Sequence, residues 1–92
     1  MNVQAEVSLY PLQTQGISEA IGSFVNVLER AGLTVHKGNM STALRGEADA
    51  VFAAVGEAFG SVADGGQVVL VMKLSNACPS DNATEGKNTR VG

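Results

Sequence analysis

The first ten residues alternate between apolar and polar side chains. A period of two predicts a strand with one apolar and one polar face. Pro11 is expected to end this strand because proline has no N–H to donate to a sheet. The apolar positions are Val3, Ala5, Val7 and Leu9, and the polar positions are Gln4, Glu6, Ser8 and Tyr10.

Two longer segments repeat apolar residues with helical spacing. This i, i+3, i+4, i+7 pattern predicts two amphipathic helices. Ser18 is the expected N-cap of the first helix and Gly32 its left-handed C-terminal residue. Gly56 and Gly60 weaken the second helix by about 1 kcal/mol each relative to alanine, so we interpret them as points where another backbone comes close. The predicted buried faces are Ile17, Ala20, Ile21, Phe24, Val25, Leu28 and Ala31, then Ala48, Val51, Phe52, Val55, Ala58, Phe59 and Val62.

Three further strands follow from shorter patterns. Residues 33–37 and 40–45 are predicted to form a hairpin around a tight Gly38-Asn39 turn. Alternate residues of the second hairpin strand point to opposite faces, and either set can face inward. One set is Met40, Thr42 and Leu44, and the other is Ser41, Ala43 and Arg45. The apolar run in residues 67–75 predicts a strand covered on both faces, as in a central strand or a subunit interface. The polar residues 76–92 are expected either to hold one short edge strand or to be mobile.

The order strand, helix, strand, strand, helix, strand predicts the fold class. Right-handed crossovers bring both helices to one face of the sheet. We therefore expect an α+β, ferredoxin-like βαββαβ sandwich with a four-stranded antiparallel sheet, as a single domain over residues 1–92. The other sheet face mixes apolar and polar residues, which is typical of an interface or a site. It should carry Glu6, Ser8, Tyr10, Thr34, His36, Val69, Val71, Lys73 and Ser75.

Composition narrows the function classes. The chain has 92 residues, 45% hydrophobic and only 4% aromatic, so its core must be mainly aliphatic, with Phe24, Phe52 and Phe59 as the large members. A net charge of −3 disfavours a nucleic-acid partner, because phosphates need a basic surface. A domain this small buries a modest fraction of its surface, so a partner subunit would stabilise it.

Several kinds of site are excluded or disfavoured. The single Cys78 permits neither an intramolecular disulfide nor a paired-cysteine metal or redox site. No apolar run reaches the roughly 18 residues of a membrane helix, and the N-terminus lacks the basic start of a signal peptide. His36 has no evident nucleophile or acid partner. We therefore expect a cytoplasmic, non-enzymatic protein without metal, cofactor or membrane partner.

The candidate ligand-binding residues each have a plainer interpretation. Glu6 either pairs with Lys73 in solvent or binds a ligand, since a half-buried carboxylate needs donors. For Ser8 and Tyr10 the plainer interpretation is sheet-interface packing, and Thr42 suits a strand by propensity alone. The candidate set is Glu6, Ser8, Tyr10, His36, Met40, Ser41, Thr42 and Lys73.

Three stretches together resemble a known family. They read AEVSLYPL at the start, MSTALRGEADAVFAAV in the middle and EGKNTRV near the end. In this order they resemble the thiamine-binding protein family, also described as MTH1187/YkoF-like or DUF77. The first-strand pattern matches fully over residues 6–12. In the inner-strand pattern Asn39, Ser41 and Arg45 depart from the family's proline, glycine and glutamate, close to the expected pocket.

The resemblance implies a ferredoxin-like fold, assembly into dimers or tetramers, and binding of thiamine or its hydroxymethylpyrimidine moiety without known catalysis. In such a site Glu6 would accept a hydrogen bond from the exocyclic amine, and the Ser8 and Thr42 hydroxyls would donate to the ring nitrogens or accept from the amine. Tyr10, Met40 and Leu44 are candidate walls for the flat ring. The alternative is a homo-oligomeric structural or regulatory, ligand-sensing module that does not bind thiamine.

Overall fold

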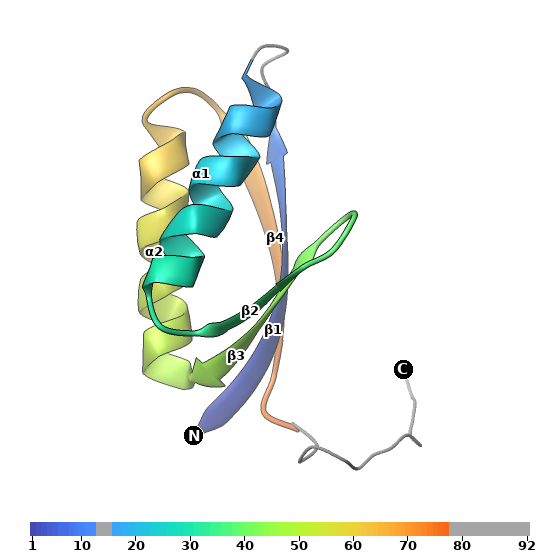
Figure 1. The fold of residues 1–92 in the computed structure, drawn as a ribbon, viewed down its shortest axis with the longest axis vertical. Coiled ribbons are helices and arrows are strands. Elements are labelled where there is room, and N and C mark those ends of the chain that lie inside the picture. Colours follow the sequence, from blue (N-terminus) through green and yellow to red (C-terminus); the bar gives the residue numbers. More distant parts are fainter. Residues whose placement is uncertain (13–15, 78–92) are drawn as a thin grey trace.

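A computed structural model describes residues 1–12 and 16–77 and confirms the predicted fold. Cys78 and the predictions for residues 78–92 lie outside the described residues. The order is βαββαβ (Figure 1). The elements are β1 (Asn2–Pro11), α1 (Ile17–Arg30), β2 (Thr34–Lys37), β3 (Thr42–Glu47), α2 (Ala48–Ala63) and β4 (Val68–Ser75).

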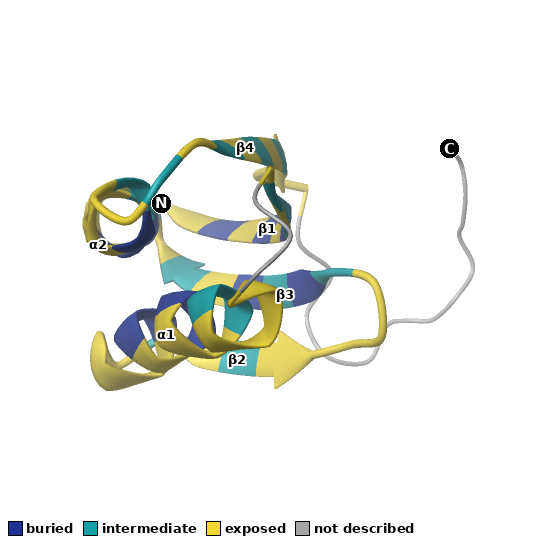
Figure 2. Ribbon diagram, turned by 90° about the horizontal axis from the view of Figure 1, so that it is seen from above, coloured by how far each residue is buried: buried dark blue, intermediate teal, exposed yellow. Residues whose placement is uncertain are grey.

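The four strands form one antiparallel sheet in the order β2-β3-β1-β4. Both helices pack on the same face, and no helix of residues 1–12 and 16–77 lies over the other face (Figure 2). Strand β4 is an edge strand, so the central-strand alternative is wrong. Val69 and Val71 of β4 are both exposed. Their burial against another subunit stays a prediction.

The register assigns every strand residue to one of the two faces. Val7 lies between Thr42 of β3 and Met72 of β4, whereas Glu6 lies between Ala43 and Lys73. Since neighbours in a row point to the same side, Thr42 faces the helices with Val7. Ala43 lies on the uncovered face with Glu6. This resolves the two alternatives that the sequence left open for β3.

The structure confirms the predicted C-terminal end of α1 but not its predicted N-cap. Gly32 takes the expected left-handed conformation, with φ of 83°. The N-cap is Gly16, with φ of 74° and no side-chain hydrogen bond, so the prediction of a Ser18 cap is wrong. The N-cap of α2 is Glu47, which makes no side-chain hydrogen bond to the helix. Its carboxylate accepts a hydrogen bond from the Met1 amine at 2.8 Å.

The core lies between the helices and the covered sheet face, around Phe24, Leu28, Leu44 and Val51. The predicted buried face of the first helix is largely confirmed, although Ile17 and Ala31 are exposed. The residues packed deepest are Val3, Ala5, Val7, Phe24, Val25, Val27, Leu28, Leu44, Val51, Ala54, Val55, Ala58 and Val62.

The predicted face of α2 is partly wrong. Phe52 is 56% exposed and Phe59 is only half-buried, whereas Ala54 is buried. The helix is turned so that small residues meet the core. A Cβ added at Gly56 or Gly60 would meet nothing within 4 Å, so no backbone from another described part of the chain comes close to either glycine.

Candidate functional site

The loop between β2 and β3 spans residues 38–41. The predicted two-residue Gly38-Asn39 turn is therefore wrong, and β3 begins at Thr42 rather than Met40. The Gly38 N–H donates to the Ser41 carbonyl at 2.8 Å and closes the loop. The last residue pair between β3 and β1 is Thr42 with Val7, so the loop lies beyond the end of this ladder. Figure 1 shows its tip projecting from the sheet.

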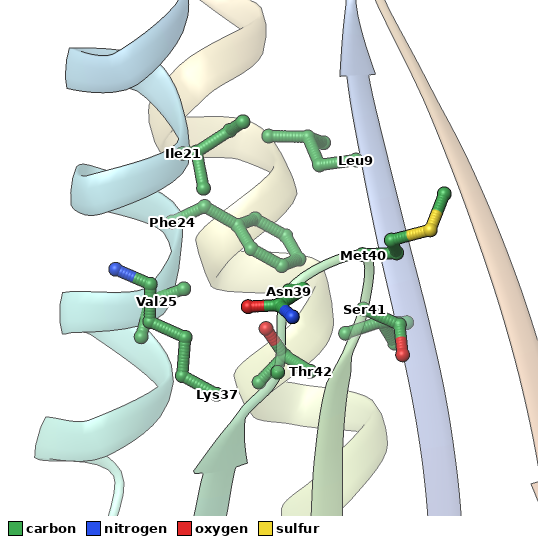
Figure 3. A pocket seen from close by; sticks show the side chains of 11 residues that line it. Leu9, Ile21, Phe24, Val25, Lys37, Asn39, Met40, Ser41 and Thr42 are labelled. Atoms are coloured by element: carbon green, nitrogen blue, oxygen red, sulfur yellow. The ribbon is translucent and has the colours of Figure 1, made fainter.

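A cavity of about 110 Å³ lies under this loop, on the helix side of the sheet. Its walls are apolar and come from β1 and α1, with the ring of Phe24 at the centre of the view in Figure 3. The hairpin supplies the polar rim. The lining residues are Val7, Leu9, Ile21, Phe24, Val25, Lys37, Gly38, Asn39, Met40, Ser41 and Thr42.

Thr42 is the one buried polar side chain among residues 1–12 and 16–77, with 7% of its surface exposed. Figure 3 shows its side chain beside Asn39 at the cavity. Within the described part of the chain its hydroxyl makes no side-chain hydrogen bond. A buried hydroxyl without a partner costs about 1–3 kcal/mol, so this atom is suited to bond a molecule that enters the cavity.

The other side of the same loop is bonded to β1. The Ser41 hydroxyl donates to Glu6 Oε2 at 2.7 Å, and Lys73 Nζ lies 3.5 Å from Glu6 Oε1. The Ser8 hydroxyl donates to the Met40 carbonyl at 3.4 Å. The Ser41 hydrogen bond, and after it the charge of Lys73, lower the pKa of the Glu6 carboxyl below its usual value. We call Glu6, Ser41 and Lys73 the outer cluster.

The structure therefore separates the predicted site residues into two groups. Thr42 lies on the covered face, whereas Glu6 and Ser8 lie on the uncovered one. A single pocket formed by Ser41 and Thr42 together with Glu6 and Ser8 is not what the structure contains, because adjacent strand residues point to opposite faces. The ligand-binding role of each residue stays a prediction. The uncovered side holds Glu6, Ser8, Tyr10, His36, Ser41 and Lys73, while Met40, 88% exposed, lies at the loop tip.

Sequence reasoning missed the cavity walls. Ile21, Phe24 and Val25 follow the helical apolar pattern, which predicts only that they belong to the core. Lys37 gave no signal either, because a lysine at the end of a short strand is ordinary. Nothing in a single sequence distinguishes an apolar side chain that fills a core from one that borders a cavity.

A second cavity of about 310 Å³ lies between the start of α1 and the end of α2, next to Pro11 at the end of β1. Among the described residues that line it, Glu19 has the one ionisable side chain, and Ser23, Ser61 and Gln67 are also present. No group of three or more His, Cys, Asp or Glu side chains that could hold a metal occurs in residues 1–12 and 16–77. No helix in these ranges is long and apolar enough to cross a membrane.

Comparison with known proteins decides the family. Residues 2–81 match the sequence profile of the YkoF-related family. The chain belongs to this family. The resemblance seen in the sequence is thereby confirmed. No curated protein matches this YkoF-related chain.

Solved structures share the fold of this YkoF-related protein. A hypothetical protein of Methanocaldococcus jannascii superposes with a TM-score of 0.79 at 29% identity, over 88% of this chain and 86% of that one. A Bacillus cereus domain of unknown function, DUF77, gives 0.74 at 25% identity, over 91% and 83%. A Thermotoga maritima protein described as a "putative thiamine biosynthesis/salvage protein" gives 0.73 at 18% identity, over 80% and 82%.

Proposed function

We propose that this YkoF-related protein binds the aminopyrimidine ring of thiamine, or free hydroxymethylpyrimidine, in the cavity under the 38–41 loop, and does not transform it. Family membership supports a small-molecule-binding role. The description of the Thermotoga maritima relative in the same fold supports thiamine chemistry in particular. The observation that carries the proposal is the buried Thr42 hydroxyl, which borders an apolar cavity and has no hydrogen-bond partner among the described residues.

The polar groups at the cavity match the ring's hydrogen-bonding pattern. An aminopyrimidine presents an exocyclic amine beside a ring nitrogen, so it offers a donor next to an acceptor. The Thr42 hydroxyl can donate to the nitrogen or accept from the amine, and the Asn39 amide can do either. The ring of Phe24 supplies a flat apolar wall for the heterocycle.

Cavity size favours one ring rather than a whole vitamin. Ligand pockets usually measure about 300–1,000 Å³, and an engineered apolar cavity of about 150 Å³ holds benzene. The 110 Å³ here suits a single six-membered ring. Lys37 at the rim repels the thiazolium cation of thiamine. We therefore expect neutral hydroxymethylpyrimidine to bind more tightly than thiamine.

Binding without turnover is part of the proposal. Of the described residues that line the cavity, only Lys37 carries an ionisable side chain. General acid–base catalysis requires a titratable group within hydrogen-bond reach of the reacting atoms, and usually a second one to return the proton. Thr42 and Asn39 can orient a ring but lack a base to activate them as nucleophiles.

Calorimetry with hydroxymethylpyrimidine, thiamine and thiamine diphosphate tests the proposal. Thr42→Val keeps the shape and removes the hydroxyl, so it should weaken hydroxymethylpyrimidine binding by about tenfold. Thr34→Val is the matched control, because Thr34 is exposed on the uncovered face. It should leave the affinity unchanged. If no compound binds the unmodified protein below about 1 mM, the proposed ligand is wrong.

The second candidate is a homo-oligomeric assembly or regulatory module. Its support is the uncovered sheet face, where Tyr10, Val69 and Val71 are exposed beside one another on β1 and β4. Adjacent exposed apolar residues of this kind mark contact surfaces. We expect a homodimer or homotetramer in sedimentation at micromolar concentration. A monomer there would remove this candidate.

A further inference from the structure

The loop that borders the cavity is bonded to the sheet by few contacts. Past the Val7–Thr42 pair the loop has left the β1–β3 ladder, while β1 continues and pairs only with β4. The described bonds from the loop to β1 are those of Ser41 to Glu6 and of Ser8 to Met40. The Ser41 bond is short and charge-assisted, whereas the Ser8 bond is long and therefore weak.

Both bonds act on the same four residues that border the cavity. Gly38, Asn39, Met40 and Ser41 all line it. In Figure 3 the Ser41 side chain points away from Phe24, toward the β1 side, while the Thr42 side chain lies at the cavity. The backbone of Ser41 therefore belongs to the cavity rim and its hydroxyl to the outer cluster.

From this geometry we infer that Glu6 is a positioning residue for the cavity: through the Ser41 hydroxyl it holds the 38–41 loop against β1 and so sets the cavity's shape from the opposite face of the sheet. Lys73 of β4 holds the second Glu6 oxygen at 3.5 Å, which orients the carboxylate toward Ser41. The inference rests on the proposed function for its binding readout. It gives Glu6 a role in binding without a direct ligand contact.

The role makes specific demands on the side chain at position 6. It must reach Ser41 and accept a hydrogen bond, which glutamine can do and alanine cannot. Glu6→Gln should therefore retain most of the wild-type behaviour. Glu6→Ala and Ser41→Ala should have the same defect. Because they break one shared bond, the double variant should be no worse than either single variant.

Hydrogen exchange of the Gly38 amide tests the loop attachment without any ligand. This amide closes the loop through its bond to the Ser41 carbonyl, so it exchanges faster when the loop opens. We expect Glu6→Ala and Ser41→Ala each to speed its exchange by about three- to tenfold, a modest change because the bond is exposed. Gln4→Ala is the matched control, since Gln4 is exposed on the same face of β1. It should change nothing.

Affinities measured by calorimetry separate positioning from direct contact. The probes are hydroxymethylpyrimidine and its analogue without the exocyclic amine. If Glu6 only positions the loop, Glu6→Ala weakens both probes by the same factor and Glu6→Gln restores both. A loss confined to the amine-bearing probe would instead make Glu6 a ligand contact and overturn the inference.

The two proposals fail in different ways. If wild-type protein binds neither probe, the proposed function fails, while the exchange rate of Gly38 still reports on the loop. If Gly38 exchange and probe affinity are unchanged in Glu6→Ala and Ser41→Ala, the positioning role is refuted, whatever the wild-type protein binds.

Discussion

The two helices pack against the same sheet but differ in how their sequences specify the buried face. In α1, polar residues such as Ser18, Asn26 and Glu29 fall on one side, and the buried residues Phe24, Val25, Val27 and Leu28 fall on the other. Helix α2 is apolar on nearly every side, with Asp49 and Glu57 as its only charged residues. A pattern therefore fixes the orientation of α1, whereas α2 offers several apolar faces of similar quality.

Packing decides what the pattern of α2 leaves open. This helix contacts α1, β1, β3 and β4, and it turns the small side chains of Ala54 and Ala58 into the core. In a close-packed interior, the buried face of a helix is the one whose side chains fit the available space, and this need not be the most hydrophobic face. Phe52 is therefore left largely outside, although it fits the apolar spacing. The exposed apolar face of α2 follows from this choice.

The largest expected difference in the free energy of unfolding is between substitutions of Phe24 in α1 and Phe52 in α2. Phe24 is 2% exposed, so Phe24→Ala should lower the free energy of unfolding by about 3–5 kcal/mol through lost burial and a new cavity. Phe52→Ala, on the exposed face of α2, should change it by no more than about 0.5 kcal/mol. Urea denaturation of both variants measures the difference. Similar losses in both would mean that another subunit covers Phe52.

Much of the fold could be predicted because its signals are local. The alternation in β1 defined a strand face, and Gly32 marked the end of α1 through its left-handed conformation. The edge position of β4 could not be predicted in the same way. Its apolar run resembles a central strand, and only the pairing of β1 between β3 and β4 reveals the true order.

The candidate site was predictable in part. Glu6, Ser41 and Lys73 were all selected from the sequence, and the structure brings them together on the uncovered side. The cavity was not predictable, because Phe24 carries the same apolar signal whether or not a void lies beside it. The face of Thr42 depended on where the hairpin loop ended, and the difference between a two-residue and a four-residue loop moves every later assignment.

The next largest expected effect is a gain in stability when a glycine of either helix is replaced with alanine. Gly22 of α1 and Gly56 of α2 are both exposed, and a Cβ at either position meets nothing within 4 Å. Gly22→Ala and Gly56→Ala should each stabilise the protein by about 0.5–1 kcal/mol, because alanine loses less backbone entropy on folding. Thermal denaturation checks the sign, and sedimentation checks the assembly.

Changes in stability of opposite sign in the two glycine variants would mean that α2 is not free of other chains at Gly56. If Gly22→Ala stabilises while Gly56→Ala destabilises or weakens self-association, a second chain must approach α2 closely at that position. The sequence-based interpretation of Gly56 would then hold between subunits, although it does not hold within one chain.

The smallest expected effect concerns the start of α1. A true N-cap serine loses about 1 kcal/mol when it is changed to alanine. Because Gly16 occupies the N-cap, Ser18 lies inside the first turn, and Ser18→Ala should alter the free energy of unfolding by no more than about 0.5 kcal/mol. Ser23→Ala, at another exposed position of α1, is the matched control. Both changes replace serine with the better helix former, so urea denaturation should give two small shifts of the same sign. If Ser18→Ala loses stability and Ser23→Ala does not, then Ser18 rather than Gly16 is the N-cap and the helix begins after Ser18.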